Sequence, residues 1–180
     1  LCNANIVNYT EVGNDCQISP STVREYFYML VDTLMINRLP AWKESKKRKS
    51  SSKDKFYFFD IGVARYLQGR KELTEGSDDY GKALESYIFH ELNAYSSYLT
   101  SEPLSFWRTP SYEVDFLIDS HTAIEVKASR SVTDRHLKGL LALKEEQIFK
   151  NYILVSLDPR ERTMKGCKIM PVTTFLDRLW

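Results

Sequence analysis

The sequence has 180 residues and a mass of 21.0 kDa, enough for one ordinary domain or two small ones. With 43% hydrophobic and 27% charged residues, its composition excludes a disordered chain. The net charge is only +1, so no overall basic field indicates nucleic-acid binding. No segment approaches the ~20 consecutive apolar residues of a membrane span, and no secretion signal is visible in the first residues given.

The three cysteines, Cys2, Cys16 and Cys167, are widely spaced and form no Cys-x-x-Cys pair. An odd, scattered set predicts neither a disulfide framework nor a structural zinc site, and it favours a cytoplasmic location. The sequence begins at Leu1 without a Met, so we expect it to be a piece of a longer protein.

Residues 1–67 predict a winged helix-turn-helix module. A short helix is expected over residues 6–16, and Ser19-Pro20 then supplies an N-cap and a first-turn proline for a second helix. The apolar stripe expected to face the core on this second helix consists of Val23, Phe27, Leu30, Val31 and Leu34. Strands are expected over residues 35–42 and 55–60, and a short helix over residues 61–67. This order of elements is typical of a winged helix.

The loop between the two expected strands concentrates the basic charge. Residues 43–55 contain seven basic and two acidic residues, and a run of three serines interrupts them. This composition predicts an exposed, mobile loop. The candidate DNA contacts in it are Lys46, Lys47, Arg48 and Lys49. A merely solvated hairpin tip is the alternative.

The second helix offers one further candidate DNA contact, Arg24. The same exposed face also carries Glu25 and Asp32, which would repel phosphates. Docking to another domain or subunit is therefore favoured over sequence-specific DNA reading by this helix.

A second module is expected over residues 80–180, after a polar linker at residues 68–79. Its first helix, over residues 80–99, places Glu85 on the same buried stripe as Ile88. A carboxylate there needs a cation, a hydrogen-bond donor or a proton. Glu85 is therefore the first candidate functional residue of this module.

Strands are expected next over residues 104–109, 113–118 and 122–128. The residues expected on one apolar face are Val114, Phe116, Ile118, Ile124 and Val126. Keeping these residues on one face pairs Phe116 with Ile124. Asp115 then lies opposite Glu125, and Glu113 lies opposite Lys127.

Opposed residues of this kind have Cβ atoms about 5 Å apart, where like charges destabilise the sheet. A divalent cation between Asp115 and Glu125 removes that cost, and carboxylates are the ligands that Mg²⁺ prefers. Lys127, on the same face, is then placed to act on a water or a phosphate. The alternative is a set of ordinary salt bridges on a solvated sheet face, but the inward Glu85 favours a metal site.

This constellation of Glu85, Asp115 and Glu125-Val-Lys127 resembles the PD-(D/E)XK phosphodiesterase superfamily, which has the restriction-endonuclease-like fold. The order of the remaining elements agrees, with a helix over residues 133–149 and strands over residues 152–157 and 167–172. The resemblance implies an α/β (α+β) fold with a central mixed sheet flanked by helices. It also implies a backbone-carbonyl metal ligand at Val126 and a catalytic role for Lys127, with Glu85 supporting the site.

A closer resemblance covers nearly the whole chain. The residues that carry it are Lys55-Phe-Tyr-Phe-Phe-Asp-Ile-Gly-Val-Ala, Gly81-Lys-Ala-Leu-Glu85, Phe106-Trp-Arg-Thr, Glu113-Val-Asp, Ile124-Glu-Val-Lys and Phe175-Leu-Asp-Arg-Leu-Trp180. They are similar to the C-terminal region of unknown function in bacterial and archaeal AAA-type ATPases. The resemblance implies an ATPase domain upstream, but these 180 residues contain no Gly-x-x-x-x-Gly-Lys-Ser/Thr motif and therefore no predicted ATP site.

We therefore expect a phosphodiesterase module that uses Mg²⁺ or Mn²⁺ to hydrolyse DNA. The alternatives are a non-catalytic DNA-binding or regulatory arm of the ATPase and a module for protein interaction alone, because a fold does not guarantee an activity.

Overall fold

The structure is a computed structural model that describes residues 3–180, so the prediction for Cys2 lies outside the described residues. Cys16 and Cys167 are free thiols. None of the helices formed by residues 3–180 is long and apolar enough to cross a lipid bilayer. The N-terminal part of the chain contains β1 (Asn5–Ile6), α1 (Tyr9–Cys16), α2 (Pro20–Asp32), β2 (Ile36–Leu39), β3 (Lys55–Phe58) and α3 (Ile61–Leu67).

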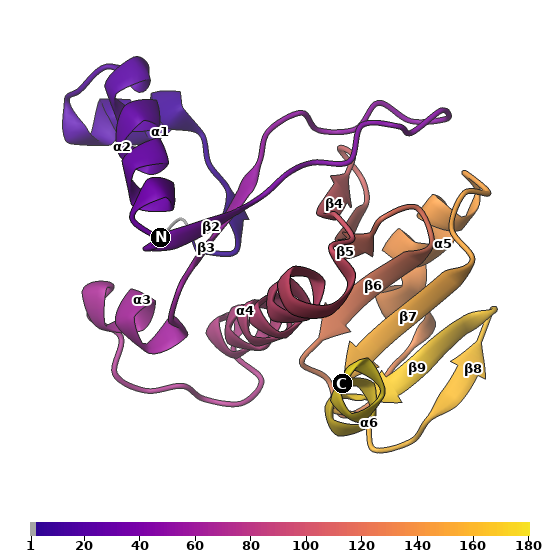
Figure 1. Cartoon of the computed structure of the whole chain (residues 1–180). Helices are drawn as coiled ribbons and strands as arrows, with labels where there is room; N and C mark the ends of the chain where they lie inside the picture. The colour runs from indigo at the N-terminus through magenta and orange to yellow at the C-terminus, as the bar shows by residue number, and fades with distance from the viewer. Residues whose placement is uncertain (1–2) are drawn as a thin grey trace.

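In the N-terminal part, α1 and α2 cover a three-stranded antiparallel sheet with the strand order β1-β3-β2 (Figure 1). Phe27 of α2 packs edge-on against Tyr9 and Phe56, with ring centroids 5.6 and 5.0 Å away. The Ser19 side chain caps α2, and Pro20 is its first residue, as predicted.

Two predictions are wrong about where the N-terminal helices begin and end. Leu34 does not join the buried stripe but is 78% exposed, because α2 ends at Asp32 and Leu34 adopts a left-handed φ of 59°. The Met35 N–H donates to the Leu30 carbonyl at 2.9 Å, a pattern that ends helices and here turns Leu34 outward. The expected helix over residues 6–16 begins only at Tyr9, since Asn5–Ile6 pair with β3 instead.

Residues 40–54, which we call the arm, leave β2 and cross to the C-terminal part before the chain returns in β3 (Figure 1). The Trp42 N–H donates to the Phe106 carbonyl at 2.7 Å, and the Phe106 N–H donates to the Pro40 carbonyl at 3.0 Å. These bonds cover the edge of the C-terminal sheet, where unpaired backbone groups would otherwise be exposed. The expected strand over residues 35–42 accordingly ends at Leu39.

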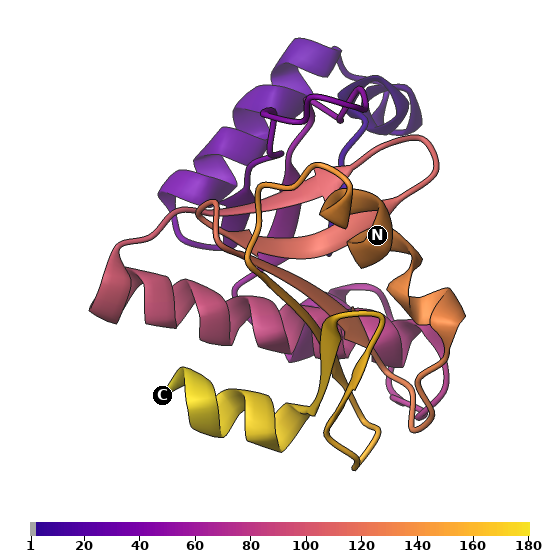
Figure 2. The same ribbon diagram turned by 90° about the vertical axis from the view of Figure 1, so that its right-hand side faces the viewer.

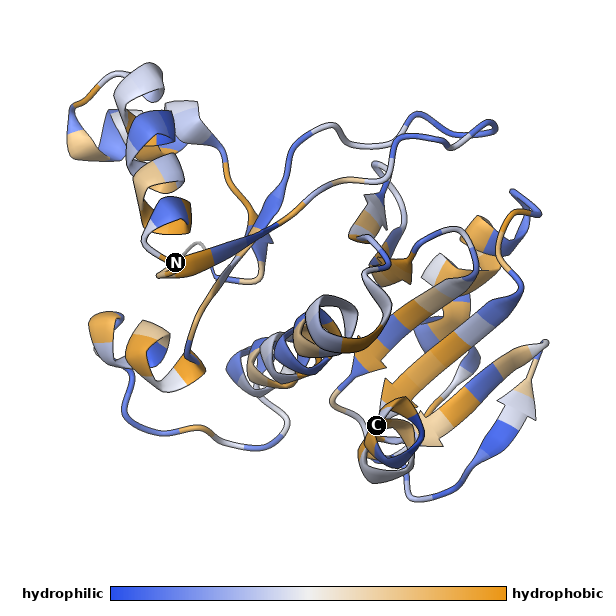
Figure 3. Ribbon diagram, in the orientation of Figure 1, coloured by the Kyte–Doolittle hydropathy of each residue, from blue (hydrophilic) through white to orange (hydrophobic). Residues whose placement is uncertain are grey.

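Glu146 fixes the tip of the arm to the C-terminal part. Its carboxylate accepts hydrogen bonds from the Ser45 hydroxyl at 2.8 Å and from the backbone N–H groups of Lys46 and Lys47 at 2.8 and 3.1 Å. The tip of the arm is therefore bound to the C-terminal part, and its mobility stays a prediction. The arm is as hydrophilic as expected (Figure 3). The lysine side chains of the tip are exposed as predicted: Lys46, Lys47 and Lys49.

The C-terminal part contains α4 (Asp78–Tyr95), a π-helix η1 (Ser96–Thr100), β4 (Leu104–Arg108), β5 (Glu113–Ile118), β6 (Thr122–Lys127), a 3-10 helix η2 (Asp134–Leu137), α5 (Lys138–Lys144), β7 (Asn151–Ser156), β8 (Arg162–Met164), β9 (Cys167–Pro171) and α6 (Val172–Leu179). Six strands form one sheet in the order β4-β5-β6-β7-β9-β8, in which β6, β7 and β9 are parallel and the other pairs antiparallel.

Helices cover both faces of this sheet (Figures 1 and 2). Phe116 and Ile124 pack with α4 and α6 on one face, whereas Leu117 and Ala123 pack with α5 on the other. The predicted mixed α+β architecture with a central mixed sheet is therefore confirmed.

A β-bulge interrupts the alternation of β5. Its pairing with β4 shifts by one residue, so that Ser105 pairs with Leu117 but Trp107 pairs with Val114. Val114 therefore packs on the α5 face, away from Phe116. The prediction that Val114 and Phe116 share a face is wrong because alternation does not continue through a bulge.

The helix expected over residues 133–149 is shorter, since η2 and α5 together end at Lys144. Glu146, expected inside that helix, instead binds the arm. Gly139 lets α5 approach β5 closely, because a Cβ at this position would lie 1.9 Å from the Glu113 carbonyl oxygen.

Candidate functional site

Asp115 lies where β5 and β6 separate. The two strands pair from Ile118 with Thr122 to Phe116 with Ile124, which is the predicted register. At the next position Asp115 Oδ2 accepts the Val126 N–H at 2.8 Å, and its side chain is only 8% exposed. Asp115 is thus held against β6 by a backbone donor of that strand.

Glu125 and Lys127 occupy alternate positions of β6 and form an ion pair. Lys127 Nζ lies 2.5 Å from Glu125 Oε1. The other oxygen, Glu125 Oε2, is buried and has no hydrogen-bond partner among residues 3–180. Because an unpaired buried carboxylate oxygen is costly, a proton or a cation is expected to bind it.

The surroundings of the two acids disfavour their ionised forms. Burial, and then the charge of Glu85, raise the pKa of Asp115 to about 6. Burial, and then the charge of Asp115, raise the pKa of Glu125 well above its ordinary value. Burial by itself lowers the pKa of Lys127, but Glu125 and Asp115 outweigh it, so the pKa rises and the ammonium stays charged at neutral pH.

Glu85 enters this region from α4, where residues of β3 hold it. Lys55 Nζ lies 3.2 Å from Glu85 Oε1, and the Tyr57 hydroxyl donates to the same oxygen at 2.7 Å. The buried carboxylate of Glu85 was predicted to need a cation or a hydrogen-bond donor, and it has a cation in Lys55 and a donor in Tyr57. Lys55 and Tyr57 alternate along β3, so one face of that strand supplies the two contacts.

Lys55 is the site residue that the sequence analysis missed. Its side chain is 2% exposed, and its Nζ pairs with Glu113 and lies 4.0 Å from Asp115. Glu113 also lies 3.3 Å from Arg108. The predicted position of Glu113 opposite Lys127 is wrong, because the bulge reverses the alternation at this end of β5. In the sequence, the only sign of this role for Lys55 was its place at the start of a strand of aromatic residues, Lys55-Phe-Tyr-Phe.

Asp115 and Glu125 fit a hard divalent cation. Their carboxylates are the ligand type that Mg²⁺ prefers, and Glu125 Oε2 lacks any other partner in the described chain. The N–H and carbonyl of one strand residue point to the same edge, so the Val126 carbonyl lies on the edge that faces Asp115. Residues 3–180 contain no group of three or more His, Cys, Asp or Glu side chains placed to hold a metal. Two carboxylates would therefore leave further ligand positions to water or substrate oxygens.

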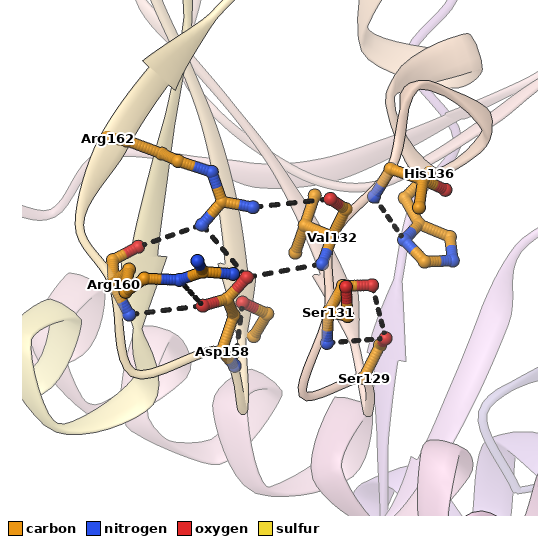
Figure 4. Close-up of polar contacts among 9 residues, drawn as sticks. Ser129, Ser131, Val132, His136, Asp158, Arg160 and Arg162 are labelled. Carbon is orange, nitrogen blue, oxygen red and sulfur yellow. Dashed lines mark hydrogen bonds and ion pairs between the residues drawn. The ribbon is translucent and has the colours of Figure 1, made fainter.

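Asp158 fixes the loop that follows Lys127 (Figure 4). Its buried carboxylate accepts the Val132 N–H at 3.2 Å and lies 2.8 Å from an Arg162 nitrogen. The Arg160 N–H donates to its other oxygen at 3.1 Å. Because β7 lies parallel to β6, the two strands end on the same side of the sheet. Asp158, which follows β7, therefore meets the loop that follows Lys127.

Comparison with protein families places the site in a known family. Residues 80–175, more than half of the chain, match a family described as a domain of unknown function, DUF4143. The chain belongs to the DUF4143 family. This family is known as a C-terminal domain of AAA-ATPase-like proteins. Residues 1–74 match a second domain of unknown function, DUF8612. Comparisons with curated proteins and with solved structures each gave no match.

The two matched regions both contribute to the site. The DUF4143 region supplies the residues predicted from sequence together with Glu113: Glu85, Glu113, Asp115, Glu125, Val126 and Lys127. Lys55 and Tyr57 belong to the region that matches DUF8612. Glu85 and Glu113 of the DUF4143 region are therefore paired with Lys55, a cation that comes from outside that region.

The predicted nucleic-acid contacts fall on two separate surfaces. Arg48 of the arm is partly buried, where it lies 2.7 Å from Glu145 and 5.5 Å from the Tyr112 ring centroid. Arg24 lies on α2, where it lines an open groove with Lys53 and the acidic Asp54. The exposed Lys46 and Lys47 lie instead at the tip of the arm, where their backbone N–H groups bind Glu146 of the DUF4143 region.

Proposed function

We propose that this chain is a metal-dependent phosphodiesterase module that acts on DNA within a larger AAA-type ATPase. The single observation that carries the proposal is the buried pair of Asp115 and Glu125, with an unpartnered oxygen on Glu125 and a charged Lys127 beside it. Buried acids that lie close together, with a charged lysine beside them, are candidates for a functional site.

The arrangement of the elements supports a nuclease-like fold for residues 80–180. A mixed sheet with helices on both faces presents Asp115 on β5 and Glu-x-Lys on the neighbouring β6. The N-terminal part, with three helices and a three-stranded sheet, likewise supports a winged helix.

Each side chain has a role in hydrolysis that follows from its charge and exposure. A Mg²⁺ ion held by Asp115, Glu125 and the Val126 carbonyl would polarise a phosphodiester and lower the pKa of an attacking water. Lys127 is 38% exposed and remains protonated, so it donates hydrogen bonds to a phosphate oxygen or to the water rather than accepting a proton. Hydrolysis then forms a bond from the water oxygen to phosphorus and breaks one phosphorus–oxygen ester bond. The attacking water loses a proton to bulk solvent, and the leaving oxygen takes one up from solvent.

The charge and position of the arm support the proposal that the substrate is a polyanion. The exposed Lys46, Lys47 and Lys49 gather at its tip, and the Ser51 N–H donates to the Arg108 carbonyl at 2.7 Å. The arm thus runs past Arg108, which pairs with Glu113 at the rim of the site. DNA phosphates bound along the arm would lie beside the carboxylates.

Cleavage of supercoiled plasmid and of single-stranded DNA in Mg²⁺ or Mn²⁺ tests this function. We expect cleavage that Lys127→Ala slows by about 100-fold or more, the cost of losing a donor to developing charge. Lys168→Ala is the matched control, because Lys168 is an exposed lysine on β9 of the same sheet. Equal rates for the two variants, or no cleavage by the wild-type chain, would contradict the proposal.

A non-catalytic DNA-binding or regulatory arm of the ATPase is the second candidate function. The buried Lys55 favours it, because this internal cation already compensates Glu85 and Glu113. Salt-sensitive DNA binding that is weakened by neutralising Lys46 and Lys47, without any cleavage, would identify this second function.

A further inference from the structure

Lys55 brings a buried cation to one side of the site. Its side chain is 2% exposed, and its ammonium contacts Glu113 and Glu85 and lies 5.2 Å from the centroid of the Phe106 ring. Buried charges are stable only when they are paired, and here the pairing joins β3 to α4 and β5. Lys55 is therefore a fixed part of the folded site.

The carboxylates of the site divide into two sets. Glu85 and Glu113 are already compensated by Lys55, with further contacts from Tyr57 and Arg108. The uncompensated oxygen is Glu125 Oε2. Lys55 lies 4.0 Å from Asp115, whereas Glu125 forms its ion pair with Lys127. A cation bound beside Glu85 and Glu113 would face the ammonium of Lys55 and be repelled by it.

We propose that Lys55 stands in place of a second metal ion, so that the site binds one divalent cation, between Asp115 and Glu125. This inference rests on the proposed function and specifies its metal stoichiometry. It also makes the N-terminal part a component of the site, since Lys55 comes from β3. Glu85 is then a positioning residue that holds Lys55, and it is not a metal ligand.

Calorimetric titration of the full chain with MnCl₂ tests the stoichiometry. We expect one Mn²⁺ per chain in the wild type and none in Asp115→Asn. In Lys55→Met, which removes the ammonium and keeps the side-chain length, we expect a second Mn²⁺ that disappears when Glu85→Gln is added. Lys53→Met, at an exposed lysine two residues away, is the control and should bind one ion.

Two ions in the wild type, or one ion in a folded Lys55→Met variant, would overturn the inference and leave the proposed function standing. No Mn²⁺ binding by the wild type would overturn the proposed function together with the inference. If Lys55→Met fails to fold, Glu85→Gln decides in the wild-type background. We expect its Mn²⁺ affinity to stay within about twofold of wild type, and a loss of tenfold or more would make Glu85 a ligand.

Discussion

At the scale of single residues, Asp115 and Glu125 are acids whose protons a metal ion would replace. Their pKa values are raised in the folded chain, to about 6 for Asp115, above the ~4 of unfolded carboxyl groups. The contribution of Asp115 to stability is therefore full below pH ~4 and is lost as the pH rises through about 6. A divalent cation bound between the two acids would supply the missing compensation above that pH.

Stabilisation by Mn²⁺ should therefore increase with pH. We expect the Mn²⁺-induced rise in melting temperature to be several degrees at about pH 7.5 and close to zero at about pH 5. Thermal unfolding with and without Mn²⁺ at the two pH values measures the difference. Asp115→Asn should abolish the rise, and an equal rise at both pH values would contradict the placement of the cation.

Asp158 should have the opposite pH dependence. Burial opposes its ionisation, but hydrogen bonds from the Arg160 and Val132 backbones and the charge of Arg162 lower its pKa to about 2. Its stabilising contribution is thus full above pH ~4 and is lost as the pH falls toward 2. In urea unfolding we expect Asp158→Asn to be clearly less stable than wild type at neutral pH and nearly equal to it near pH 2. A constant difference across this range would refute the assignment.

The residues of the site differ in how far sequence could predict them. Strand alternation and the pairing of Phe116 with Ile124 predict Asp115 directly opposite Glu125. In the structure the pairing of β5 with β6 ends at Phe116 and Ile124, and Asp115 reaches β6 by accepting the Val126 N–H. Lys55 could not be found in this way, because local periodicity says nothing about contacts between β3 and β5. Only its burial in the folded chain identifies it.

At the scale of elements, the close contact of α5 with β5 depends on Gly139. A Cβ added there would lie 1.9 Å from the Glu113 carbonyl oxygen, so helix or strand must shift. We expect Gly139→Ala to lower the unfolding free energy by about 1–3 kcal/mol, the usual cost of overpacking.

Chemical denaturation of Gly139→Ala measures this loss, with Gly81→Ala as the control. Gly81 lies in α4, and a Cβ added there meets nothing within 4 Å, so we expect no loss of stability in the control. A Gly139→Ala variant as stable as wild type would show that α5 can move away from β5 without cost.

Element boundaries were less predictable than element types. The apolar pattern predicts a helix over residues 133–149, but α5 ends at Lys144 because Glu146 binds backbone groups of the arm. Alternation likewise fails at the β5 bulge, which is set by pairing with β4. Both departures arise from contacts between distant segments, which periodicity does not contain.

At the scale of the whole molecule, the arm joins the two parts through Glu146. Three donors from the arm converge on this one carboxylate, and hydrogen bonds to charged groups contribute about 1.5–3 kcal/mol each. Composition predicted the basic charge and exposure of the arm, but a local pattern could not predict its fixed course over the C-terminal part.

Removing Glu146 should release the arm. We expect Glu146→Ala to increase trypsin cleavage at Lys46–Lys49 by about tenfold or more, because the open form becomes more populated. Glu145→Ala, which removes only an exposed ion pair with Arg48, is the matched control and should change cleavage little. Unchanged cleavage in Glu146→Ala would show that other contacts hold the arm.

The most direct test of the central claim is a crystal structure of the chain with Mn²⁺, in which anomalous scattering locates the ion. We predict a single ion about 2.1 Å from Glu125 Oε2 and from one oxygen of Asp115, with Lys55 still paired to Glu113. An ion bound by Glu85 and Glu113 with Lys55 displaced, or no ion beside Glu125 at saturating Mn²⁺, would contradict the account.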